Sequence, residues 1–297
     1  MCFYFLIITH LVDISNKLNI FKMCIHINEM GGDLMDKKRE EIIKLLPKEI
    51  RKLFMMSEID FSRLQEIRLR VNMPLIVVYG AKEYFISCTG KPVSEIKEAY
   101  RVTCQQIKEA MVYISSYSRY AFEDEIRQGF ITVEGGHRVG VAGRIIWDGG
   151  KIKSITYISF INIRISHEVI GCSDSVIGYL YNDDSFYNTL IISPPRCGKT
   201  TLLRDIVRSI ANGNAGSRGR TVGIVDERSE ISACHLGCPQ NNIGCRTDVL
   251  DGCPKSEGMM MLVRSMSPEI VAVDEIGSRE DAAAIDYVMN CGINIIA

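Results

Sequence analysis

No uninterrupted run of 18 apolar residues occurs in this chain of 297 residues, so no stretch is expected to span a membrane as a helix. An excess of charge of either sign is also missing, because 35 Lys and Arg face 36 Asp and Glu. Without a global basic field, any contact with nucleic acid must be local. The 11 cysteines lack paired spacing and follow no convincing signal peptide, so we expect reduced thiols in a cytoplasmic protein.

A zinc site is the alternative interpretation for the cysteines between residues 234 and 253. The candidate ligands are Cys234, Cys238, Cys245 and Cys253, with His235 beside the first of them. Their spacing contains no C-x₂-C knuckle. We therefore favour small reduced thiols in the core or in loops over a metal centre.

Residues 1–34 differ in character from the rest of the chain. Their apolar stretch, residues 2–12, is too short to span a membrane, and no Lys or Arg precedes it as a signal peptide requires. A weak membrane anchor is one interpretation. We favour another, because Gly31-Gly32-Asp33 can be encoded by GGAGGTGAT, a bacterial ribosome-binding sequence, just upstream of Met35. Translation would then begin at Met35, and residues 1–34 would be a leader-derived extension.

Residues 35–185 are expected to form a small α+β domain. Apolar periodicity predicts helices over 37–46 and 102–111, and alternation over 64–71 predicts a half-buried strand. Further strands are predicted at 75–79, at 155–164, and in a hairpin of 130–133 with 137–146 around Gly135-Gly136.

Residues 186–297 are organised around a phosphate-binding loop. An apolar run ends in Ser193-Pro194-Pro195-Arg196-Cys197-Gly198-Lys199-Thr200-Thr201, and an amphipathic helix pattern follows. Ser193 stands where G-x-x-x-x-G-K-[ST] has its first Gly, and the two prolines would rigidify the turn instead. Backbone N–H groups of this loop can wrap a phosphate, Lys199 can reach the β- and γ-phosphates, and the Thr200 hydroxyl can ligate Mg²⁺. The expected cofactors are ATP and Mg²⁺.

Two later apolar runs end in acidic pairs. Residues 221–225 lead into Asp226-Glu227, and residues 270–273 lead into Asp274-Glu275. Such runs are typical of strands buried on both faces, and open α/β sheets bind ligands at the carboxyl ends of their strands. We expect Asp274 to hold Mg²⁺ and Glu275 to polarise the attacking water. The expected fold is α/β, with a parallel-sheet P-loop core preceded by the small α+β domain.

Four motifs are highly specific in combination. They are Ser193-Pro-Pro-x-x-Gly-Lys-Thr-Thr-Leu-Leu-Arg-Asp, Val225-Asp-Glu-Arg-Ser-Glu-Ile, Gly244-x-Arg-Thr-Asp-Val-Leu-Asp-x-Cys-Pro-Lys and Arg264-Ser-Met-Ser-Pro-Glu-Ile-x-Ala-Val-Asp-Glu-Ile-Gly. From about residue 35 to the end, the chain closely resembles the stage III sporulation protein AA family of endospore-forming bacteria, which is similar to secretion and pilus-retraction ATPases. The resemblance implies a RecA-type motor subunit that assembles into a hexameric ring. It also implies work in the mother-cell cytoplasm, on the membrane channel complex between mother cell and forespore.

The resemblance carries roles onto particular residues. It matches Lys199 and Thr200 to the Walker A site, and Asp274 and Glu275 to Walker B. It also matches Asp226, Glu227 and Glu230 to the acidic box of secretion ATPases, in which a Glu orients the attacking water. Lys199, Glu227 and Glu275 are therefore the candidate catalytic residues, and Thr200 and Asp274 the candidate Mg²⁺ ligands.

Arginines are the remaining candidates. ATP sites between the subunits of a ring imply an arginine in trans, and the candidates are Arg138, Arg144, Arg164 and Arg246. The alternative for each is a solvated or locally paired side chain. Arg264 matches an arginine that precedes the Walker B strand of the family.

The last strand pattern, residues 293–297, ends the chain, whereas the family continues with a Thr-x-His element. We expect the ATPase domain to be incomplete there, with Ile293, Ile295 and Ile296 at an unpaired sheet edge. A nucleic-acid-associated P-loop ATPase is the competing function. Its best surface, residues 113–127, mixes four aromatic residues with Glu123, Asp124 and Glu125, so a nucleic-acid partner is not expected.

Overall fold

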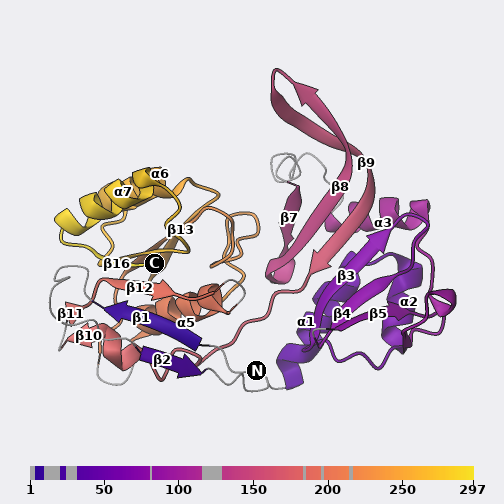
Figure 1. Cartoon of the computed structure of the whole chain (residues 1–297), viewed down its shortest axis with the longest axis horizontal. Coiled ribbons are helices and arrows are strands. Elements are labelled where there is room, and N and C mark those ends of the chain that lie inside the picture. Colours follow the sequence, from indigo (N-terminus) through magenta and orange to yellow (C-terminus); the bar gives the residue numbers. More distant parts are fainter. Residues whose placement is uncertain are drawn as a thin grey trace. The chain divides into compact units, whose positions relative to one another are not determined.

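The computed structural model describes residues 4–9, 21–24, 32–80, 82–115, 129–182, 185–194, 197–213 and 217–297. The chain divides into two units, which are described separately (Figure 1). The N-terminal unit is residues 29–167, and the C-terminal unit is residues 168–297 together with residues 1–28. This division lies upstream of the boundary that the sequence pattern predicts at residue 185.

Alternating apolar residues build an antiparallel sheet in the N-terminal unit. In β3 (Leu64–Arg70), the side chains of Leu64, Ile67 and Leu69 are buried, and the polar residues between them are more exposed. The strand order is β6-β5-β4-β3-β9-β8-β7. The other strands are β4 (Ile76–Tyr79), β5 (Lys82–Ile86), β6 (Pro92–Val93), β7 (Phe130–Val133), β8 (His137–Asp148) and β9 (Lys151–Arg164). The predicted hairpin around Gly135-Gly136 is confirmed, because β7 pairs with β8 across that turn.

Among the described residues, the helices α1 (Gly32–Leu45), α2 (Lys48–Met56) and α3 (Cys104–Ile114) complete the core of the N-terminal unit. Helix α3 begins two residues later than the periodicity predicts. Thr103 accepts a hydrogen bond from the Gln106 backbone N–H, and the Gln106 side chain accepts one from the Thr103 N–H. This capping box fixes the start of the helix at Cys104.

Strands β8 and β9 extend past their neighbours as a two-stranded ribbon (Figure 1). β7 pairs with β8 only as far as Gly140, and β3 pairs with β9 only from Phe160 on, whereas the β8–β9 pairing continues to Asp148. Arg144 and Trp147, the single tryptophan of the chain, are exposed on this ribbon.

Two histidines, of which His137 is buried and His167 half-buried, are expected to make the N-terminal unit acid-sensitive. Burial lowers the pKa of His137 to about 3, and burial together with Lys38 lowers that of His167 to about 4. In the unfolded chain these histidines are protonated with a pKa near 6.5, whereas in the folded chain they stay neutral to a lower pH. The free energy of unfolding is therefore highest above pH 6.5 and falls as the pH drops toward 4. For fully buried His137 the loss between pH 6.5 and 5 is about 2 kcal/mol. The protection factors of the β3 and β9 amides, which correct for the pH dependence of intrinsic exchange, should therefore be lower at pH 5 than at pH 7. His137→Gln should flatten this response, His235→Gln in the C-terminal unit should not, and equal protection at pH 7 and 5 contradicts the expectation.

Continuous apolar runs form a parallel sheet in the C-terminal unit. Its strands are β12 (Thr189–Ile192), β13 (Val222–Asp226), β14 (Thr247–Asp251), β15 (Ile270–Val273) and β16 (Asn294–Ile296). They lie in the order β14-β13-β15-β16-β12, and β1 (Tyr4–Thr9) and β2 (Phe21–Cys24) extend the sheet antiparallel beyond β12. Ahead of β12, η4 (Ile177–Leu180) leads into the small hairpin of β10 (Tyr181–Asn182) and β11 (Ser185–Phe186).

Helices cover both faces of this sheet, as the continuous apolar strands require. On one face, Ile224 and Ala272 pack with α5 (Lys199–Asn212). On the other face, Val225 and Val271 pack with α6 (Lys255–Ser265) and α7 (Arg279–Asn290) (Figure 1). The C-terminal unit therefore has the predicted α/β class, and the N-terminal unit is α+β. No helix among the described residues combines the length and hydropathy needed to cross a bilayer.

The sequence pattern is wrong about one strand of this unit and misses another. β16 is not an edge strand, because it pairs with β15 on one side and β12 on the other, and Ile295 and Ile296 are buried. Residues 247–251, where no strand is predicted, form β14, which pairs with β13 along its length. Both errors concern the make-up of the sheet, which local patterns do not encode.

Candidate nucleotide site

The phosphate loop connects β12 to α5. Gly198 has a φ of 86°, a left-handed conformation that suits glycine, and α5 begins at the next residue, Lys199. No side chain of the described residues caps this helix N-terminus, so its first N–H groups can bind an anion. Of the predicted loop, Ser193, Pro194 and Cys197 lie in this connection, and Thr200 and Thr201 lie in the first turn of α5. Pro195 and Arg196 lie outside the described residues.

Residues of the predicted Walker A and Walker B motifs meet at this point. The Thr200 hydroxyl donates a hydrogen bond of 2.9 Å to Oδ1 of Asp274, which directly follows β15. Burial raises the pKa of Asp274, as do the charges of Glu230 and Asp226, whereas the Thr200 bond and Lys199 lower it. A hydroxyl and a carboxylate beside an uncapped helix N-terminus are the groups that bind Mg²⁺ and phosphate together, so these residues fit a Mg²⁺-nucleotide.

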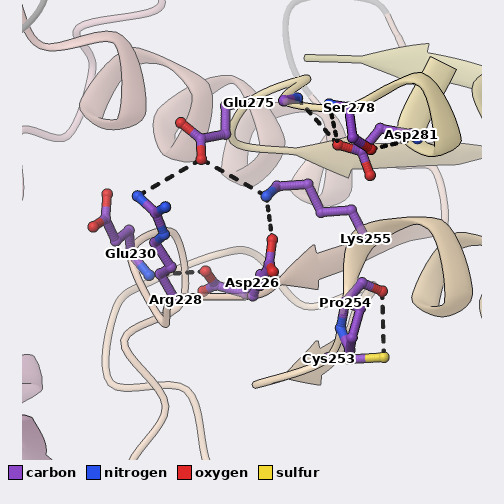
Figure 2. Close-up of polar contacts among 11 residues, drawn as sticks. Asp226, Arg228, Glu230, Cys253, Pro254, Lys255, Glu275, Ser278 and Asp281 are labelled. Atoms are coloured by element: carbon purple, nitrogen blue, oxygen red, sulfur yellow. Dashed lines mark hydrogen bonds and ion pairs between the residues drawn. The ribbon is translucent and has the colours of Figure 1, made fainter. Parts of the chain in front are cut away.

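The two acidic pairs lie on neighbouring strands at the same height. In the β13–β15 register Val225 is opposite Val273, so Asp226-Glu227 and Asp274-Glu275 leave the sheet side by side. After Glu275 the chain turns sharply into α7. Ser278 and Asp281 form a capping box, and Asp281 also accepts a hydrogen bond from the Gly277 N–H (Figure 2). This turn fixes the direction in which the Walker B strand ends.

Asp226 holds the loop that follows β13. Its carboxylate is buried and accepts hydrogen bonds from the backbone N–H groups of Glu230, Ile231 and Ser232, and from the Ser232 hydroxyl. From α5, Arg204 donates to the carbonyl oxygens of Ile231 and Glu230 at 2.6 Å each. These contacts indicate that Asp226 stabilises the loop, and that Glu227 is the more solvent-exposed acid of this pair.

Lys255 joins the two glutamates. Its ammonium group makes an ion pair with Glu227 and lies 3.8 Å from Oε1 of Glu275. Arg228 approaches the same Glu275 oxygen at 3.7 Å (Figure 2). The glutamate side chains are 41% and 43% exposed, whereas that of Lys255 is 7% exposed. Glu227 and Glu275, which the sequence makes candidate catalytic residues, are therefore brought together by one buried cation.

The candidate arginines are divided between the two units. The guanidinium carbon of Arg138 lies 3.6 Å from the centre of the Phe130 ring. Arg138 is opposite Arg164 in the β8–β9 pairing, and Arg144 lies on the ribbon that these strands form. The Arg246 guanidinium donates a hydrogen bond of 2.9 Å to the carbonyl oxygen of Ala211. Ala211 is near the C-terminal end of α5, which is the end away from the predicted phosphate loop. Arg264 is exposed in the last turn of α6.

The four cysteines between residues 234 and 253 differ in their exposure to solvent. Cys234 is buried, Cys238 and Cys245 are exposed, and Cys253 is partly buried. Burial raises the pKa of Cys234 to about 11 and also raises that of Cys253. Among the described residues, no three His, Cys, Asp or Glu side chains gather in a way that would hold a metal ion.

Sequence reasoning gave neither Lys255 nor Arg204 a role in this site, although both lie in the specific motifs. A lysine or an arginine in a helical pattern ordinarily indicates an exposed charge. The signal for Lys255 was its place at the end of the motif Cys253-Pro254-Lys255, and the signal for Arg204 was its place after Leu203 in the loop motif.

A family model and a curated relative both match most of this chain and point to the same family. The family model for "Sporulation stage III, protein AA" matches residues 36–297. Stage III sporulation protein AA of Bacillus subtilis (strain 168) is 40% identical over 257 residues, covering 86% of this chain and 80% of that protein. An uncharacterized ycf45 protein of Cyanidium caldarium is 33% identical over 151 residues, which are 50% of this chain and 40% of that protein.

Among solved structures, the chain is similar to the Legionella pneumophila ATPase DotB, with a TM-score of 0.48 and 13% identity over 91% of this chain and 66% of that chain. It is also similar to the pilus retraction motor PilT with bound ADP, with a TM-score of 0.49 and 14% identity over 78% and 62% of the two chains. The family model and the Bacillus relative, which extend over most of the sequence, establish that the chain belongs to the sporulation stage III protein AA family.

Proposed function

We propose that this chain is an ATP-hydrolysing motor subunit that works as a homo-oligomeric ring. The observation that carries the proposal is the 2.9 Å hydrogen bond between the Thr200 hydroxyl and Asp274 beside the uncapped N-terminus of α5. Family membership supports a role in endospore formation. Within that role, we propose that the ring is hexameric and energises the channel complex between mother cell and forespore. It would act from the mother-cell cytoplasm, held at the membrane by its partners.

The chain's own groups divide the work. The backbone N–H groups at the start of α5 and the Lys199 ammonium bind the phosphates, and Thr200 and Asp274 hold the metal. Bound Mg²⁺ supplies positive charge to the phosphate oxygens. Glu275 orients the attacking water and accepts its proton, as a half-exposed carboxylate one residue beyond Asp274 can do. Glu227, tied to Lys255, is the second acid within reach.

The test is the ATPase rate per subunit, measured against protein concentration with and without DNA. A ring with sites between subunits should gain specific activity as concentration rises, and DNA should not change it. A rate independent of concentration contradicts the ring. Stimulation by DNA favours the competing nucleic-acid-associated ATPase, and no hydrolysis at any concentration contradicts the motor.

A trans arginine should separate binding from turnover. Replacing the correct one of Arg138, Arg144, Arg164 and Arg246 with Ala is expected to leave ATP binding intact and to lower kcat by about 10³-fold. Mixing that variant with Lys199→Ala subunits should restore part of the activity, because some mixed interfaces pair an intact loop with an intact arginine. Arg218→Ala is the control, since this exposed residue pairs with Glu269. Absence of rescue for all four arginines contradicts the trans assignment.

A further inference from the structure

Lys255 is a buried cation that three separate parts of the C-terminal unit enclose. It is the first residue of α6, and its ammonium contacts Glu227 beyond β13 and Glu275 beyond β15 (Figure 2). Lysine is seldom this deeply buried unless its charge is paired, and here two carboxylates pair it. No role in phosphate or Mg²⁺ binding falls to it, because the loop, Thr200 and Asp274 supply those groups.

Small residues bring α6 close enough for this contact. A Cβ atom on Gly258 would lie 2.5 Å from Cγ1 of Val225, and one on Gly223 would lie 2.9 Å from Cδ1 of Leu262. Both distances are shorter than real Cβ contacts, so the helix lies directly against β13 only because these two positions lack side chains. Pro254 is the residue just before the helix, and its fixed φ restricts how the chain enters α6.

The register explains why a cation is needed there. Glu227 and Glu275 leave adjacent strands at the same height, and two carboxylates in that arrangement repel each other. A cation between them offsets the repulsion and holds both side chains in fixed directions. We propose that Lys255 is a positioning residue of the ATPase reaction, which acts through Glu275 by holding it, together with Glu227, in the orientation that serves the attacking water. This inference rests on the proposed function.

The test uses the full chain and compares Lys255→Met with Lys255→Arg. Met keeps the length of the side chain without its charge, so kcat is expected to fall at least 10-fold while KM for ATP and nucleotide affinity change less than twofold. Arg restores the charge and should recover part of kcat, though its larger planar head fits the site less well. Arg218→Gln removes a cation of the same unit that pairs with Glu269 instead, and should leave kcat unchanged.

A double-mutant cycle distinguishes positioning from a general structural role. If Lys255 acts through Glu275, Lys255→Met should have little further effect on single-turnover hydrolysis in the Glu275→Gln background. Equal fold-losses in both backgrounds, or a wild-type kcat for Lys255→Met, overturn the inference. If Lys255→Met does not fold, Lys255→Gln, which retains a hydrogen-bond donor, enters the same cycle. A wild-type chain without turnover contradicts the proposed function itself, and this inference with it.

Discussion

Glu275→Gln is expected to slow ATP hydrolysis by about two to four orders of magnitude while ATP binding stays intact. The amide keeps the shape of the side chain and its place beside Lys255 and Arg228, but it cannot accept a proton from water. The loss should appear in kcat, with the dissociation constant of ATP unchanged. Nucleotide binding by a fluorescent ATP analogue and turnover by phosphate release measure the two quantities on the same preparation.

Two other variants complete this comparison. Lys199→Ala should weaken ATP binding as well as abolish hydrolysis, because the ammonium contacts phosphates in the ground state and the transition state alike. Glu227→Gln should cost less than Glu275→Gln, since Glu227 is bound to Lys255 and follows the strand that carries no metal ligand. If Glu275→Gln hydrolyses ATP normally and Glu227→Gln does not, the catalytic acid lies on β13 and the assignment to β15 is wrong.

The core of the C-terminal unit was predictable because its elements follow from local rules. An apolar run, a Gly-Lys-Thr turn and an amphipathic helix predict strand, loop and helix in that order. The two Asp-Glu pairs follow continuous apolar runs, so the sequence also predicts that both lie at one edge of a parallel sheet. The hydrogen bond between Thr200 and Asp274, 74 residues apart in sequence, agrees with that expectation.

What could not be predicted depends on contacts distant in sequence. The position of β16 between β12 and β15 is a property of the whole sheet, and the isolated pattern Ile293 to Ile296 is compatible with an edge as well as a centre. The burial of Lys255 depends on how closely α6 approaches β13, which Gly223 and Gly258 permit. Neither glycine is part of a turn signal, so a reading of local patterns gives them no weight.

The roles of Asp226 and Asp274 also separate only in three dimensions. Both follow apolar strands and precede Glu, so their local sequences are equivalent. The Asp226 carboxylate accepts hydrogen bonds from three backbone N–H groups and a hydroxyl. The Asp274 carboxylate instead accepts a hydrogen bond from the Thr200 hydroxyl. Family resemblance places Asp226 in an acidic box, but its contacts are those of a residue that shapes the box for Glu227 and Glu230.

Asp226→Ala is therefore expected to cost about 3–5 kcal/mol of stability in the C-terminal unit. The side chain is 1% exposed, and its removal leaves the N–H groups of Ile231 and Ser232 without their acceptor. Asp226→Asn should cost less, because one amide oxygen can still accept part of these bonds. Urea unfolding should show both losses, and amide exchange of residues 230–232 should accelerate before the rest of the sheet opens.

Asp248→Asn is the matched control for stability, because Asp248 is an exposed aspartate on β14, the strand that pairs with β13. Its free energy of unfolding should stay within about 0.5 kcal/mol of the wild-type value, the range typical of surface substitutions. The two aspartates are thus expected to give opposite results, because only the carboxylate of Asp226 is buried and accepts backbone hydrogen bonds. If Asp226→Ala unfolds at the wild-type urea concentration but loses ATP turnover, Asp226 acts in the reaction itself and the structural role assigned to it is wrong.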